Sequence, residues 1–138
     1  MKSDTTPTAS TGSANPAPGF AKHPDHVLAI TQLMPPRRVI VSLNGETIAD
    51  TLCALEVSES KYPARYYVPK ADVAMGKLSG TEKSTYCPFK GTARYWTVSA
   101  GSAEIENGAW AYDDPYDECT DLKDHICFFG EQMDIRIG

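Results

Sequence analysis

The stretch from Arg38 to Asp50 reads RVIVSLNGETIAD and contains the clearest fold signal in the chain. Its Asn44-Gly45 pair favours a tight two-residue turn, because both residues readily adopt the positive φ angles that such a turn requires. Residues that prefer strands flank the pair on both sides, and a two-residue turn places Val41 opposite Ile48. The stretch therefore predicts an antiparallel hairpin.

More strand patterns follow this hairpin. Leu55 and Val57 alternate with polar residues, as in a strand with one buried face. Glu59 has the same parity, so its carboxylate points toward the core side, where it needs a partner. Further strands are predicted at 65–68, 94–98, 103–105, 109–112, 126–129 and 133–137, and Asn107-Gly108 separates two of them. The segments between the strands are predicted to contain a helical turn at 71–75, a polar loop at 76–83 and a short helix from about 116 to 123.

The pattern predicts a mainly β fold of compact antiparallel sheets with one short helix. Residues 1–19 are nearly all Ser, Thr, Ala, Pro, Gly and Asn, a composition that favours disorder. Residues 20–30 are expected to dock as an arm, and Pro35-Pro36 marks a boundary. We therefore predict a disordered tail and arm over 1–34 and a single β domain over 35–138.

Composition narrows the class of protein. The chain has 138 residues, with 18 acidic and 13 basic side chains and a net charge of −5. This balance argues against nucleic acid and against an anionic membrane as partners. No apolar run approaches the ~20 residues of a membrane span, and no apolar segment of a signal peptide follows Lys2. We expect a cytoplasmic protein with reduced thiols.

Three motifs carry a resemblance to a known family. They are RYYVP at 65–69, TYCPFKG at 85–91 and AWAY at 109–112. Together they resemble the domain of unknown function 427 family, which also has the label of a nucleotidyltransferase-like domain. The resemblance covers about 36–138 and implies a compact antiparallel fold similar to the β-tent of small zinc-binding domains.

The chain departs from two features that these labels suggest. Zinc-binding β-tent domains use paired CxxC knuckles, which this sequence lacks, so we expect neither a metal nor another cofactor. The sequence also lacks the spaced carboxylates that metal-dependent phosphoryl chemistry needs.

Cys87 is the most distinctive single residue, because it lies in a turn with Lys90 three positions away. A nearby cation favours a reactive thiolate, whereas a free cysteine is also among the most commonly buried residues. A nucleophile needs a base. His125 is the one histidine in the predicted domain, and His23 and His26 are interpreted as a chance pair on the arm.

Glu59, Arg65 and Lys90 form a second candidate group. An inward carboxylate beside cations suits a general base or an anchor for a polar ligand. It equally suits a buried ion pair that fixes the register of strands. Arg65 and Tyr67 share a parity, and both face the side of Glu59 if the register holds between the two strands.

Aromatic side chains with polar tips are dense in the predicted strands, which favours a cleft in which a planar ligand stacks. We predict a domain that binds a small molecule. The residues expected to border its cleft are Glu59, Arg65, Tyr67, Cys87, Lys90, Trp96 and Trp110. Two alternatives remain: an enzyme that uses Cys87 or Glu59 on a small substrate, and a homo-oligomeric interaction module.

Overall fold

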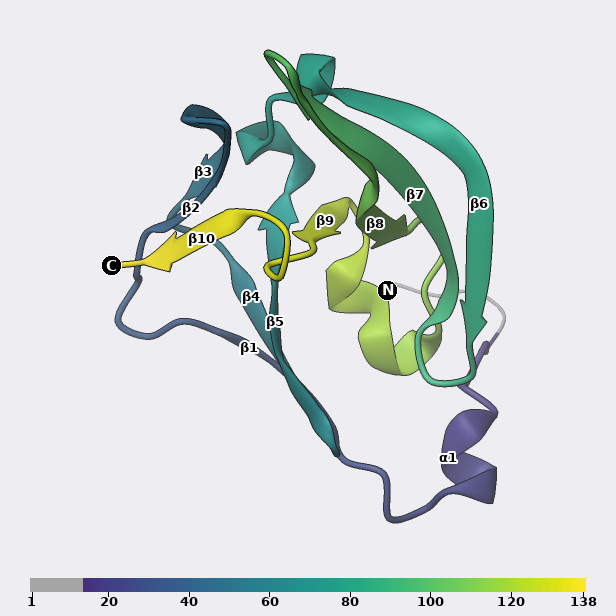
Figure 1. Ribbon diagram of the computed structural model, residues 1–138. Coiled ribbons are helices and arrows are strands. Elements are labelled where there is room, and N and C mark those ends of the chain that lie inside the picture. Colours follow the sequence, from purple (N-terminus) through teal and green to yellow (C-terminus); the bar gives the residue numbers. More distant parts are fainter. Residues whose placement is uncertain (1–13) are drawn as a thin grey trace, which may run out of the picture.

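The computed structural model describes residues 14–138, so most of the predicted disordered tail lies outside the described residues. Antiparallel strands dominate the fold, and the helical segments are short (Figure 1). The prediction of a mainly β fold of antiparallel sheets with a short helical segment is confirmed.

The larger sheet has seven strands in the order β1-β4-β5-β9-β8-β7-β6. In chain order they are β1 (Leu28–Gln32), β4 (Leu55–Glu59), β5 (Tyr62–Pro69), β6 (Leu78–Cys87), β7 (Gly91–Ala100), β8 (Ala103–Tyr112) and β9 (His125–Phe128). The smaller sheet has the order β10-β2-β3 and consists of β2 (Val39–Leu43), β3 (Glu46–Thr51) and β10 (Asp134–Ile137).

The hairpin predicted from Asn44-Gly45 joins β2 to β3, and both turn residues have positive φ angles of 52° and 77°. A bulge after Val41 changes the register, so Val41 lies opposite Ala49 rather than Ile48 as predicted. Ile48 is the extra residue of the bulge, and both Val41 and Ile48 are nevertheless fully buried.

The helical segments are α1 (Gly19–Lys22), η1 (Lys70–Asp72), η2 (Met75–Lys77) and η3 (Asp117–Leu122). The helix predicted at 116–123 is therefore a short 3₁₀ segment, with non-helical backbone at Cys119. It buries Cys119 and Leu122 as expected. The predicted helical turn at 71–75 is replaced by η1 and η2 on either side of Val73 and Ala74.

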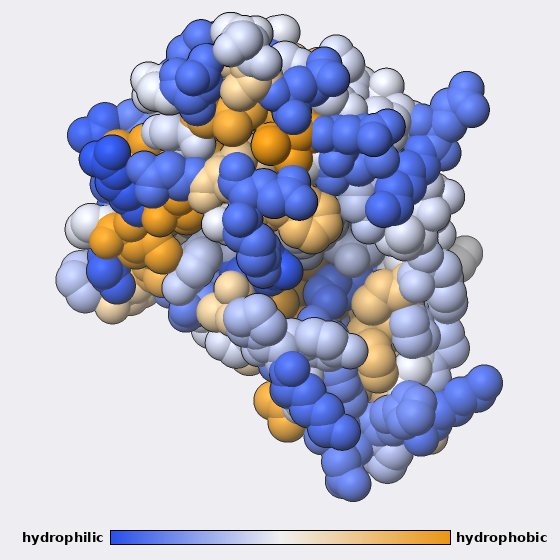
Figure 2. All heavy atoms as spheres, viewed as in Figure 1, coloured by the Kyte–Doolittle hydropathy of each residue, from blue (hydrophilic) through white to orange (hydrophobic). Residues whose placement is uncertain are grey.

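Two hydrophobic clusters cover the two faces of the larger sheet. One contains Val41 and Ile48 of the smaller sheet together with Trp96 and Phe128. The other contains Tyr67, Tyr95 and Trp110 and is covered by Cys119 and Leu122 of η3. Hydrophobic side chains reach the face shown in Figure 2 only in small, separate groups. The second cluster is unusually rich in aromatic rings with polar tips, and it borders the site described below.

Two predictions about strand limits are wrong. The expected polar loop at 76–83 instead provides most of β6, which pairs with β7 along its length except for a bulge between Gly80 and Ser84. The expected break at Asn107-Gly108 lies inside β8, where Asn107 has a φ of 53°. In both places a bulge absorbs polar or turn-favouring residues without ending the strand.

The N-terminal segment belongs to the folded part, which begins before the boundary expected at residue 35. β1 pairs with β4 from Leu28↔Glu59 to Gln32↔Leu55. Ahead of it, the Asn15 and Ala17 amides donate to the carboxylates of Asp117 and Glu118 at 2.7 and 2.8 Å. The segment thus runs from η3 through α1 to the larger sheet (Figure 1). Among the described residues, no helix has the length and apolar character needed to cross a membrane.

Gly19 tests this docking. A Cβ at Gly19 would lie 2.7 Å from the Phe89 ring and 2.9 Å from the Pro88 carbonyl oxygen, so Gly19→Ala should lower the free energy of unfolding by about 1–3 kcal/mol. Gly76→Ala is the matched control, because a Cβ there meets no atom within 4 Å. Urea denaturation of both variants measures the effect, and equal stability would contradict the described packing of the arm.

Candidate functional site

A cleft of about 450 Å³ opens where the tip of the β4–β5 hairpin meets the β6–β7 turn and β8. Its walls combine apolar rings, phenol hydroxyls and three charged side chains. The lining residues are Val57, Glu59, Tyr62, Pro63, Arg65, Tyr67, Tyr86, Cys87, Pro88, Phe89, Lys90, Trp110 and Tyr112. A volume of this size is typical of small-molecule sites.

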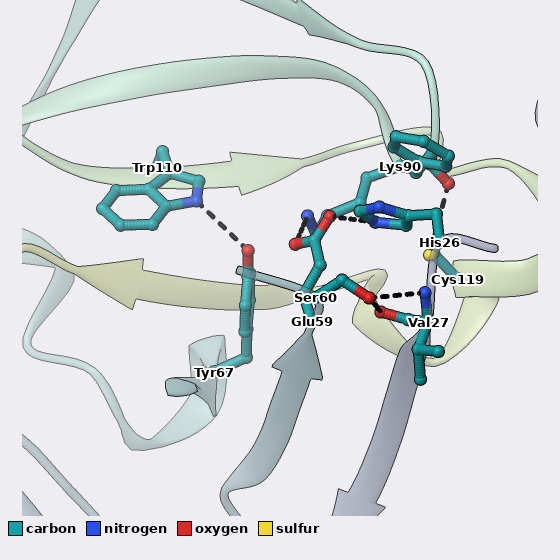
Figure 3. A network of polar contacts seen from close by, with 9 residues as sticks. His26, Val27, Glu59, Ser60, Tyr67, Lys90, Trp110 and Cys119 are labelled. Atoms are coloured by element: carbon teal, nitrogen blue, oxygen red, sulfur yellow. Dashed lines mark hydrogen bonds and ion pairs between the residues drawn. The ribbon is translucent and has the colours of Figure 1, made fainter. Parts of the chain in front are cut away.

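A carboxylate held between two partners lies in this cleft (Figure 3). Glu59 Oε1 accepts a hydrogen bond from Lys90 Nζ at 2.6 Å, and Oε2 contacts His26 Nε2 at 2.8 Å. The three side chains are only 10–12% exposed. Because burial of a lone carboxylate is costly, the two partners are what allow Glu59 to stay here.

The β6–β7 turn places Lys90 through its backbone. Gly91 has a φ of 121°, a conformation that only glycine adopts readily, and its neighbours close the turn with Cys87 opposite Gly91. The Pro88 carbonyl accepts the Gly19 amide at 2.9 Å, and the Lys90 carbonyl accepts the Tyr116 amide at 3.0 Å. The arm and the segment before η3 therefore fix the turn from two sides.

His26 is placed by stacking. Its ring lies parallel to that of Phe89, with ring centroids 3.7 Å apart and 10° between the planes. The next residue, Val27, donates its amide to Ser60 Oγ at 2.8 Å, just after Glu59. One ring of the TYCPFKG turn thus holds the histidine that contacts Glu59, and the arm completes the site.

Aromatic groups form the inner wall. The Trp110 Nε1–H donates to the Tyr67 hydroxyl at 3.2 Å (Figure 3). The Arg65 guanidinium lies 5.4 Å from the centre of the Trp110 ring, and its Nη1 donates to Glu131 at 3.0 Å. These contacts hold the indole and the guanidinium in defined positions.

Two phenols in the wall remain protonated. Burial raises the pKa of Tyr67 well above its usual value, and the nearby Cys127, Tyr112 and Glu59 raise it further. Burial likewise raises the pKa of Tyr112, with Cys87, Tyr95 and Glu59 adding to the effect. Both hydroxyls are therefore hydrogen-bond donors at neutral pH.

Six of the seven residues predicted to border a cleft lie together in this one: Glu59, Arg65, Tyr67, Cys87, Lys90 and Trp110. Glu59 and Arg65 face the same cleft because Val57, which shares the parity of Glu59 on β4, lies opposite Arg65 on β5.

Trp96 does not join them. It follows Tyr95, which pairs with Trp110, and successive residues of a strand point to opposite faces. Trp96 is therefore buried in the cluster against the smaller sheet, with Arg94 4.4 Å from its ring centre. The prediction that Trp96 borders the cleft is wrong. The sequence does not give the register of β7 against β8, so it does not show which face of the sheet Trp96 occupies.

The histidine of the site is His26, which the sequence analysis missed. His125 lies on β9, bonds the Lys123 carbonyl and does not line the cleft. The available signal that the arm continues as a strand was the β-branched residues Val27, Ile30 and Thr31. Among residues 14–138, no group of three or more His, Cys, Asp or Glu is arranged to hold a metal ion.

A comparison with protein-family models identifies the family of the chain. A model described as Domain of unknown function (DUF427) matches residues 31–137. The chain belongs to this family. No curated protein matches the chain. Glu59 and Lys90 lie inside the DUF427 match, whereas His26 precedes it, so the arm adds a residue from outside that span to the site.

The four cysteines of this DUF427 protein should differ in reactivity. Cys53 is exposed and Cys87 half-buried, whereas burial raises the pKa of Cys119 to about 11 and of Cys127 to about 12. Because the thiolate is the nucleophile, iodoacetamide at about pH 8 should modify only Cys53 and Cys87 in the folded chain. Peptide mass mapping with and without denaturant provides the measurement. Modification of Cys119 or Cys127 at the rate of Cys53 would contradict the described packing.

Proposed function

We propose that this protein binds a small organic molecule in the cleft between the β4–β5 hairpin and the β6–β7 turn. The observation that carries the proposal is the Glu59–Lys90 pair, nine-tenths buried in a cavity of about 450 Å³. A buried ion pair stabilises a fold little compared with apolar side chains of similar size, because desolvation offsets the attraction. Charged groups in a concave site are more typical of ligand recognition.

The remaining wall supports the same function. Trp110 offers an indole ring, and Pro63 and Pro88 add apolar surface on opposite sides of the cleft. The rings of Tyr62 and Tyr86 are 64% and 59% exposed at the lining of the cleft, where a ligand would cover them. Aromatic walls with a few fixed polar groups favour a planar ligand held in one orientation.

An enzymatic role is the second candidate, because the half-buried Cys87 thiol lines the same cleft as Glu59. In that case Cys87 would be the nucleophile on a small bound substrate. Both Glu59 oxygens already have partners, so the carboxylate is better placed to orient His26 and Lys90 than to accept a proton itself. Nucleotidyl transfer is not part of the proposal, since Glu59 is the one carboxylate among the described residues of the cleft lining.

The two tryptophans provide an internal test of ligand binding. A library of small neutral and charged aromatic compounds is titrated at millimolar concentration while heteronuclear NMR follows both indole N–H signals. We expect binders to shift the Trp110 signal and leave that of Trp96, which is buried on the opposite face of the sheet. Trp110→Phe and Trp96→Phe assign the two signals. A library that shifts neither signal, or both equally, would contradict a ligand site in this cleft.

A further inference from the structure

The cleft contains more hydrogen-bond donors than its own acceptors satisfy. Lys90 Nζ carries three N–H groups, and one of them donates to Glu59. Within residues 14–138, no other group accepts a hydrogen bond from Lys90, although its side chain is only 10% exposed. A buried ammonium with donors to spare indicates a ligand that accepts them.

The two phenols add to this excess. The Tyr67 hydroxyl accepts from Trp110, which leaves its own hydrogen to donate. The Tyr112 hydroxyl has no hydrogen-bond partner among the described residues, although the residue is only 7% exposed. A phenol is protonated at neutral pH even at its ordinary pKa of about 10, and burial raises the pKa values of both further. Both hydroxyls can therefore donate a hydrogen bond to a ligand in the cleft, and neither carries a negative charge that would repel an anion.

The charge of the lining points the same way. Two cations, Arg65 and Lys90, and one anion, Glu59, line the cleft of a chain whose net charge is −5. Glu131, outside the lining, pairs with Arg65. Each Glu59 oxygen already has one partner, Lys90 or His26, and keeps one further acceptor site. An entering carboxylate would meet more cationic than anionic groups in the lining itself, in spite of the overall acidity of the protein.

From these contacts we propose that the ligand is a small planar organic acid, whose carboxylate lies between Lys90 Nζ and the hydroxyls of Tyr67 and Tyr112. Its planar body then lies along the Trp110 side of the cleft. Arg65 lies over the Trp110 ring and is paired with Glu131, so it is not the primary contact of the carboxylate. This inference rests on the proposed small-molecule function and specifies its ligand class.

Matched acids and amides test the class directly. Benzoate and indole-3-carboxylate are compared with benzamide and indole-3-carboxamide, which have nearly the same shape but no charge. Dissociation constants come from NMR titration of the full-length protein. We expect each acid to bind about tenfold more tightly than its amide or better, the factor expected for one hydrogen bond to a charged group.

Tyr112→Phe is the decisive variant, because it removes a hydroxyl that bonds no described group and so leaves the fold intact. It should weaken acid binding about tenfold and amide binding much less. Tyr66→Phe is its control, since the Tyr66 hydroxyl bonds Glu56 outside the cleft. The double variant Glu59→Leu/Lys90→Met, which leaves no buried carboxylate unpaired, should abolish the preference for acids. Lys83→Met is its control, because Lys83 lies over the Tyr95 ring and not in the cleft.

The outcomes separate this inference from the function on which it rests. Tighter binding of the acids, lost in Tyr112→Phe and kept in Tyr66→Phe, supports the organic-acid class. Amides that bind as tightly as the acids, with the Trp110 signal shifted, would overturn the class and leave a small-molecule site. An acid preference unchanged in Tyr112→Phe would overturn the carboxylate position. Absence of binding by all four probes and by the wider library would overturn both proposals.

Discussion

The buried carboxylate of Glu59 is the constraint around which the site is arranged. It lies at the end of β4, and it is stable there only because Lys90 and His26 reach it from distant parts of the chain. Lys90 comes from a turn at the opposite side of the seven-stranded sheet, and His26 from the arm before β1. The need to pair one charge therefore places the turn, the arm and the hairpin around one cleft. Phe89 links two of these, because its ring stacks on His26 while the neighbouring Pro88 carbonyl binds Gly19.

The fold class followed from local patterns, and the strand limits did not. Asn44-Gly45 predicted the first hairpin, because the turn chemistry acts over only a few residues. The same dipeptide at Asn107-Gly108 lies in a bulge inside β8, where the pairing of its flanking residues with β7, and of Ala109 and Trp110 with β9, outweighs the turn preference. The polar residues of β6 looked like a loop because an exposed edge strand has no buried face to give it alternation. Bulges, which shift the register by one or two residues in this protein, are visible only once the partner strand is known.

The site was predictable where parity within one strand was sufficient. Arg65 and Tyr67 alternate on β5, and the charge of Glu59 required a partner, so these side chains were placed from the sequence. Trp96 was misplaced because the sequence does not relate the parity of β7 to that of β8. His26 was missed because a segment rich in proline and polar residues precedes it, and its role depends on a stacked ring more than 60 positions away. Contacts of this range are set by the tertiary fold and have no local signal.

We propose that the Glu59–Lys90 pair serves ligand binding and adds no stability to the fold. The most direct test is the free energy of unfolding of the double variant Glu59→Leu/Lys90→Met, measured by urea denaturation. Because desolvation offsets the attraction of a buried pair, apolar replacements of similar size should leave the protein as stable as the wild type or more stable. A loss of more than about 1 kcal/mol would show that the pair stabilises the fold, and would contradict the account.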